Sequence, residues 1–286
     1  MAISFENPPL VELIAELRWG IPSILPASQQ SVGFVLPIPT VPSSRLEEFF
    51  MRFGSRIAAD GFGRFERVVP PGFPLLPFQP VYRFRKVGEE AGTTLYQLGS
   101  GLFSANITPP YQSWTSFEPI VTRGVELLLE CRDENEKHAP FHTASVRYIN
   151  AFSAALTEGR SIGAFMSEIL GIEIRLPEIL TKQLAADSEV TPVLQLTIPA
   201  IGDRRMALNI AEGLVNNEPA IIMDTTVSST RETPPLKDGA IKVLNAAHDL
   251  IHQTFIELTE KLHSLMKPRN DSADYAPSQF TSDAAP

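Results

Sequence analysis

The sequence predicts an α+β fold in which a curved, largely antiparallel sheet carries two longer helices on one face. Strand-like segments arrive in adjacent pairs with short turns, as in residues 81–107 and 191–229. A parallel sheet would instead need a helix at nearly every crossover. A long helical segment closes the chain before Pro268. The predicted order of the first half is strand, helix, strand, strand, helix, strand.

The first element is predicted as a strand over residues 10–19, directly after Pro8-Pro9. Helical periodicity is the alternative here, but strict alternation gives one wholly apolar face, which favours a strand. Glu12 and Glu16 then share the wetter face, where they are available to pair with Arg or Lys on a neighbouring strand. Two carboxylates can do general acid and base work when a pocket separates their pKa values. Alternation already explains both as surface residues, so no catalytic residue is predicted.

The rest of the first half alternates between proline-rich loops and regular elements. Prolines divide residues 20–43 into predicted short strands and loops, and they make residues 68–80 a predicted long loop. The expected helices run from Ser43 or Ser44 to residue 60, and from a cap at Ser113 or Thr115 to about Cys131. The expected strands span 81–87, 93–107, with a bulge near 99–101, and 142–154.

The second half begins with a short helix over residues 161–171, capped by Ser161. Three strands follow at 191–200, 205–215 and 219–229, with Gly202-Asp203 and Asn216-Asn217 as turn residues. A long helix starts near residue 237. We expect one domain over residues 1–266, in halves of about 1–155 and 156–266, and a disordered tail over residues 267–286.

Composition bounds the class of protein. The 286 residues carry a formal charge of -9 and include 43% hydrophobic residues, enough for a substantial core. That net negative charge argues against binding to nucleic acid or to an anionic membrane surface. Cys131 is the single cysteine, and the N-terminus lacks the basic start and apolar run of a signal peptide. We therefore expect a cytoplasmic protein.

Four motifs in order resemble a sporadically distributed bacterial protein family of unknown function. They are F-x-N-P-P-L-V-E near Phe5, P-Y-x-S-W at 110–114, R-Y-I-N at 147–150, and H-D-L-I-H in the last helix. The resemblance extends from Phe5 to about Met266. It implies a bacterial cytoplasmic protein and supplies no known catalytic residues.

The candidate binding residues are Tyr111, Trp114, Arg147 and Asn150. Tyr111 and Trp114 precede or open a helix, and the first N–H groups of a helix favour anions. Arg147 and Asn150 lie on a strand of the same half. We expect the four side chains to contribute to a ligand or partner surface. The alternative is structural: Trp114 and Phe117 fix the helix to the sheet while Ser113 caps it.

His248 and His252 form the one metal-ligand pattern that the sequence offers. Histidines at i and i+4 on a helix can both bind zinc, as in HExxH metalloproteases. Asp249, however, is a methylene shorter than the glutamate of that motif, and His248 falls on the apolar stripe of its helix. A packed histidine is therefore favoured, and no metal is predicted.

The favoured interpretation is a non-enzymatic binding protein that recognises a macromolecular partner. No GxSxG elbow, phosphate-binding loop or dinucleotide motif occurs, so no cofactor is predicted. The sporadic family is typical of bacterial defence or toxin–antitoxin loci, which implies a neutralising or sensing partner. The alternative is a helix-grip-like protein for a small ligand, and the third is a metal-dependent hydrolase that uses the HDLIH helix. The apolar stripe of that helix also allows a homodimer, although burial against its own sheet is favoured.

Overall fold

The computed structural model describes residues 4–20, 43–88, 93–185 and 188–269. The predicted α+β class with a large antiparallel sheet and a long C-terminal helix is confirmed. Most of the proline-rich 20–43 segment, and the tail from residue 270 onward, lie outside the described residues. The predicted start of the disordered tail at residue 267 was wrong, because β11 (Pro268–Arg269) pairs with β1 (Ser4–Phe5).

The main sheet has nine strands in the order β3-β4-β5-β6-β2-β7-β10-β9-β8, and every neighbouring pair is antiparallel. The strands are β2 (Leu10–Trp19), β3 (Arg64–Arg67), β4 (Pro80–Arg85), β5 (Thr94–Gly99), β6 (Leu102–Ile107), β7 (Phe141–Ser153), β8 (Leu194–Ala200), β9 (Arg204–Val215) and β10 (Glu218–Ser229). Because β2 pairs with both β6 and β7, the first strand of the chain joins the two halves of the sheet.

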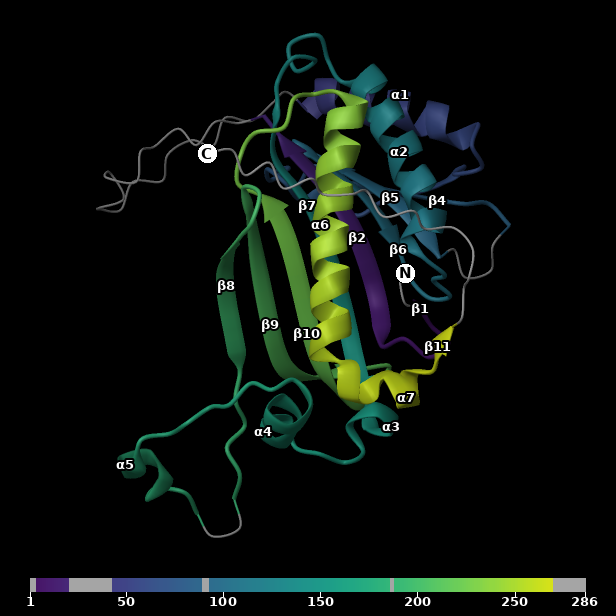
Figure 1. The fold of residues 1–286 in the computed structure, drawn as a ribbon. Coiled ribbons are helices and arrows are strands. Elements are labelled where there is room, and N and C mark those ends of the chain that lie inside the picture. Colours follow the sequence, from purple (N-terminus) through teal and green to yellow (C-terminus); the bar gives the residue numbers. More distant parts are fainter. Residues whose placement is uncertain (1–3, 21–42, 89–92, 186–187, 270–286) are drawn as a thin grey trace, which may run out of the picture.

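Three long helices lie over one face of the sheet: α1 (Ser43–Ala58), α2 (Trp114–Cys131) and α6 (Lys237–Leu258). α1 contacts β4, α2 contacts β6, and α6 lies along β7 and β10 (Figure 1). The short helices are α3 (Ala154–Thr157), α4 (Ile162–Ala164), the π-helical turn η2 (Phe165–Ile169), α5 (Glu178–Thr181), the 3-10 turn η3 (Glu260–Leu262) and α7 (His263–Met266). Among the described helices, none combines the length and the apolar character needed to cross a membrane.

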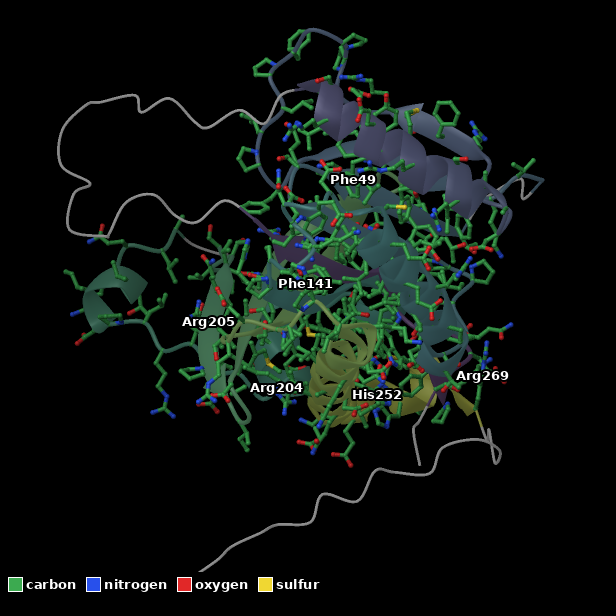
Figure 2. All side chains as sticks on the ribbon, turned by 90° about the horizontal axis from the view of Figure 1, so that it is seen from above. Phe49, Phe141, Arg204, Arg205, His252 and Arg269 are labelled. Carbon is green, nitrogen blue, oxygen red and sulfur yellow. The ribbon has the colours of Figure 1, made fainter. Side chains whose placement is uncertain are left out.

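Alternation in β2 builds the layer beneath the helices. Leu13, Leu17 and Trp19 have no exposed area and Ala15 is 1% exposed, whereas Ile14, Glu16 and Arg18, which alternate with them, are partly exposed. Trp19 packs edge-on against Phe49 and Phe141, with ring centroids 6.3 and 6.2 Å away, and both phenylalanines are labelled in Figure 2. The buried stripe of α6 closes the same layer, so this stripe packs within the chain.

The residues at the hairpin turns adopt the backbone conformations that such turns need. Gly202, Asp203, Asn216 and Asn217 all have positive φ, which confirms the predicted turns. Asn216-Asn217 is a two-residue turn, and residues 201–203 form a three-residue loop between β8 and β9. The predicted bulge at 99–101 is instead a tight turn between β5 and β6, with Gly101 at φ +68°. The short β3 was not predicted.

The last helix was predicted as continuous, but it breaks at Thr259. The hydroxyl of Thr259 donates to the Phe255 carbonyl at 2.7 Å, and the residue is fully buried. The chain then turns through η3 into α7, which carries it to β11 beside the N-terminal residues.

Substitution of Gly124 tests the contact between α2 and the sheet. A Cβ atom there would collide with the Tyr96 ring and would lie 2.7 Å from Phe103. Overpacking of this kind costs about 1–3 kcal/mol, which exceeds the helix propensity of roughly 1 kcal/mol that alanine adds. We expect Gly124→Ala to lower the free energy of unfolding in urea. Gly239→Ala is the control, because its nearest atom is 3.9 Å away; it should be neutral or stabilising. Equal effects at the two sites would contradict the packing described.

Candidate functional site

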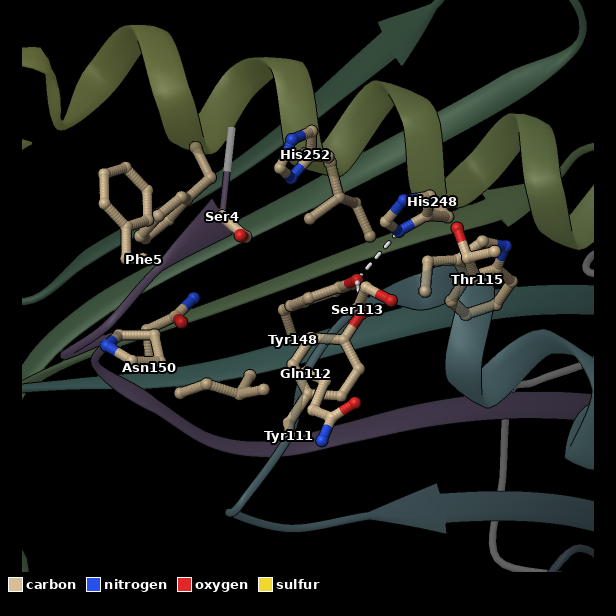
Figure 3. A pocket seen from close by; sticks show the side chains of 15 residues that line it. Ser4, Phe5, Tyr111, Gln112, Ser113, Thr115, Tyr148, Asn150, His248 and His252 are labelled. Carbon is tan, nitrogen blue, oxygen red and sulfur yellow. Dashed lines mark hydrogen bonds between the residues drawn. The ribbon is translucent and has the colours of Figure 1, made fainter. Parts of the chain in front are cut away.

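A cavity of about 120 Å³ lies between α6 and the sheet, at the point where α2 begins (Figure 3). β1 and the first residues of β2 border one end of it. The described residues that line it are Ser4, Phe5, Pro8, Leu10, Tyr111, Gln112, Ser113, Trp114, Thr115, Tyr148, Asn150, His248, Ile251, His252 and Phe255. Four stretches of the chain therefore meet at this one place: residues 4–10, 111–115, 148–150 and 248–255.

The start of α2 is fixed by a capping box. The Ser113 hydroxyl accepts from the backbone N–H of Ser116, and the Ser116 side chain reaches back to the backbone of Ser113. The next residue, Trp114, is turned toward α6. Its ring stacks on His248 at 4.6 Å with an interplanar angle of 7°, and its Nε1 donates to Asn245 at 2.9 Å. Ser113 thus caps the helix as the structural alternative predicted, whereas Trp114 joins α2 to α6 and also forms a wall of the cavity.

A hydrogen bond of 2.7 Å between the Tyr148 hydroxyl and Nδ1 of His248 joins the sheet to α6. The Tyr111 hydroxyl lies 3.5 Å from that of Tyr148, which extends the polar row across the floor of the cavity. His252 follows His248 by one helical turn, with ring centroids 5.6 Å apart. The i, i+4 spacing therefore places both imidazoles on the side of α6 that borders the cavity (Figure 3).

Burial keeps these titratable groups uncharged. Burial lowers the pKa of His248 to about 3, with a smaller contribution from His252, and it also lowers the pKa of His252. Burial raises the pKa of both Tyr111 and Tyr148. Among the described residues that line the cavity there is no Asp, Glu, Lys or Arg. At neutral pH the lining therefore presents hydrogen-bonding groups without net charge.

This electrostatic setting suits binding better than proton transfer. A general acid or base works best when its pKa lies near the working pH. Here the pKa of His248 is moved far below neutrality and that of Tyr148 upward. The pair can donate and accept hydrogen bonds, but it is poorly placed to give or take a proton at pH 7.

Asn150 supplies a polar group of a different kind. It is 3% exposed, and its side chain points into the cavity from β7 (Figure 3). Its amide makes no hydrogen bond to another described residue, and its polar atoms still reach the open space of the cavity. The amide is therefore positioned to bind a polar group of a ligand.

The structure brings together three of the four predicted binding residues: Tyr111, Trp114 and Asn150. Arg147 lies on the opposite face of the sheet, where its Nε and Nη2 donate to Asp224 at 2.8 and 2.6 Å. An offset of three residues along a strand reverses the face, so Arg147 and Asn150 cannot enter one pocket. Tyr148 was missed, although its even offset from Asn150 placed both on one face.

Glu12 and Glu16 also lie on the face away from the cavity. Glu16 accepts from Nε of Arg18 at 2.6 Å, and Glu12 accepts from the Asn106 amide at 2.7 Å. Both glutamates are partly buried. Their hydrogen-bonding partners are thus a neighbour on the same strand and an amide on β6, while Arg147 on the adjacent strand β7 interacts with both glutamates electrostatically.

The two histidines of HDLIH do not meet a third ligand in the part of the chain that the structure describes. No group of three or more His, Cys, Asp or Glu side chains is arranged there to hold a metal ion. One nitrogen of His248 is already engaged by Tyr148. His248 is therefore a hydrogen-bonded, packed residue in this structure.

The buried imidazole predicts a pH dependence of stability. Because the pKa of His248 is lower in the folded chain than in the unfolded chain, the unfolded state takes up a proton first as pH falls. The free energy of unfolding should decrease between about pH 6.5 and pH 4, by up to about 1.4 kcal/mol per pH unit for this group. When the free energy of unfolding is measured by urea titration at each pH, it should decrease less steeply with falling pH in His248→Gln than in the unsubstituted chain. The control is His138→Gln at an exposed position, which should show the same pH dependence of stability as the unsubstituted chain. Parallel plots of stability against pH for His248→Gln and the unsubstituted chain would refute the assignment of this pH dependence to His248.

Comparison with known proteins adds no further assignment to this geometry. The chain matches no protein-family model, no curated protein and no solved structure.

Proposed function

We propose that this protein binds a small, neutral, ring-containing molecule in the cavity between α6 and the sheet. The observation that carries the proposal is the chemistry of the lining: apolar and aromatic walls, no formal charge, and the buried Asn150 amide without a protein partner. Binding sites for small molecules commonly combine apolar walls with a few placed polar groups. This is the small-ligand alternative that the sequence left open.

The size of the cavity limits the ligand. A cavity of about 120 Å³ is close to the engineered cavity of about 150 Å³ that holds benzene in another protein. One aromatic or heterocyclic ring therefore suits the enclosed part. Trp114, Phe5 and Phe255 offer flat apolar surfaces to such a ring, and Asn150 offers a donor and an acceptor to its polar substituent.

The absence of charge in the lining limits the ligand further. Transfer of an ionised carboxylate or ammonium into this setting would leave it without a counter-charge among the described lining residues. A phenol, an indole or a neutral amide loses far less on leaving water. Recognition of a macromolecular partner in a bacterial defence or toxin–antitoxin locus stays a prediction that rests on the sequence resemblance.

The proposal is tested with matched pairs of probes followed by protein-detected NMR. Phenol, indole and benzamide should shift resonances of cavity residues and raise the midpoint of thermal unfolding. Benzoate and benzylamine, which have similar rings but carry charge at pH 7, should do neither. Selective binding of a charged probe in this cavity, or no binding by any neutral ring, would remove the support for the proposal.

Two substitutions locate the binding. His252→Trp should fill the cavity and abolish binding, whereas Gln253→Trp, one residue along α6 and exposed, should not. Asn150→Leu should weaken binding of benzamide by about tenfold, since one hydrogen bond contributes about 0.5–1.5 kcal/mol. Binding of indole to Asn150→Leu checks that the cavity survives. Unchanged affinity in His252→Trp would place the ligand elsewhere.

A further inference from the structure

The two edges of the nine-stranded sheet differ in how they are protected. An edge strand exposes unpaired N–H and C=O groups, and proteins usually protect it by shortness or charge. β3 at one edge has four residues and carries both Arg64 and Glu66. β8 at the other edge has seven residues, and no charged residue occurs from Val190 to Gly202. Pro199 is the one protective feature that β8 contains.

The exposed part of β8 is apolar on the side of the sheet that carries the helices. Leu196 and Ile198 are 36% and 42% exposed, and they lie beside the buried Leu208 and Met206 of β9. Ile201, at the turn after β8, is 91% exposed. An apolar strip therefore continues the core layer outward to the free edge.

A segment that precedes β8 in the chain carries further exposed apolar side chains. α5 and its flanking residues stand away from the body of the protein in both views (Figures 1 and 2). Ile179 and Leu180 of α5 are 66% and 50% exposed, and Leu184 just after it is 43% exposed. Apolar side chains presented in this way, together with an unprotected strand, are typical of surfaces that another chain covers.

We propose that β8 pairs with β8 of a second copy of this chain, antiparallel about a twofold axis at Leu196, so that the sheet continues across both copies. In this register Leu196 faces its own counterpart and Leu194 faces Ile198. The paired surfaces are thus the same on both chains, as a twofold interface requires. The segment Leu194–Ile198 ends just before Pro199, so the pairing does not need the N–H group that proline lacks.

The lack of charge along β8 makes a second copy an acceptable partner. Each copy carries a formal charge of -9, so two copies approach best through a surface without acids, and residues 190–202 form such a surface. The register also brings Thr191 of one copy opposite Ile201 of the other, so that the paired segment extends beyond β8 at both ends. The apolar side chains along this segment are then covered by their counterparts on the other copy.

The mass of the protein in solution tests the proposal. Sedimentation equilibrium should give the full chain twice its single-chain mass of 31.5 kDa. Leu196→Lys should reduce this to 31.5 kDa without changing the circular dichroism spectrum, because the side chain is already partly exposed. Phe65→Lys is the matched control: Phe65 is an exposed apolar residue on the other edge strand, and the variant should remain dimeric. A monomeric unsubstituted chain at submillimolar concentration, or a dimer unaffected by Leu196→Lys, would overturn the proposal.

A cysteine placed on the axis tests the register. The Cβ atoms of directly opposed residues lie about 4.5–5.5 Å apart, so Leu196→Cys should form a covalent dimer under mild oxidation. Native Cys131 is buried, so the unsubstituted chain should not form one. Phe65→Cys is the control and should stay a single chain on a non-reducing gel. A dimer in solution that Leu196→Cys does not crosslink would exclude this register.

Discussion

Three long helices have to cover one face of a nine-stranded sheet, and this mismatch in width shapes the rest of the structure. Nine strands about 4.8 Å apart form a face roughly 38 Å wide. Three helices packed about 10 Å apart cover roughly 30 Å of it. The helices cover the middle of the sheet well, as the unexposed Leu13, Leu17 and Trp19 of β2 demonstrate. Part of the apolar face must therefore be covered by something else.

The shortfall appears in two places. Where α2 begins beside α6, the gap is bridged by the stack of Trp114 on His248 and by the bond from His248 to Tyr148, and a cavity stays between them. Beyond α6, the outer strand β8 has no long helix over it and exposes Leu196 and Ile198. The proposed ligand and the proposed second copy would each cover apolar surface that the helices leave open.

Local patterns predicted much of the fold, because alternation and turn residues act over a few neighbours. β2, the hairpins of the second half and the cap at Ser113 follow from such signals. The cavity was harder to predict, since it joins β1, β2, β7, α2 and α6 through contacts such as Tyr148 with His248, 100 residues apart. The alternation of side chains along a strand, however, is enough to predict that Arg147 and Asn150 lie on opposite faces of the sheet. The break at Thr259 depended on burial that no local pattern contains.

The central claim is that α6 meets the sheet through a buried, uncharged contact at His248. Long-range 15N–1H NMR of the imidazole nitrogens, with the His248 signals assigned from the spectrum of His248→Gln, tests it most directly. A pKa of about 3 predicts that His248 keeps the shifts of a neutral ring, with one nitrogen protonated, from pH 7 down to pH 4. Protonation with a midpoint near 6.5, the usual value for histidine, would mean that the ring is not buried as described and would contradict the account.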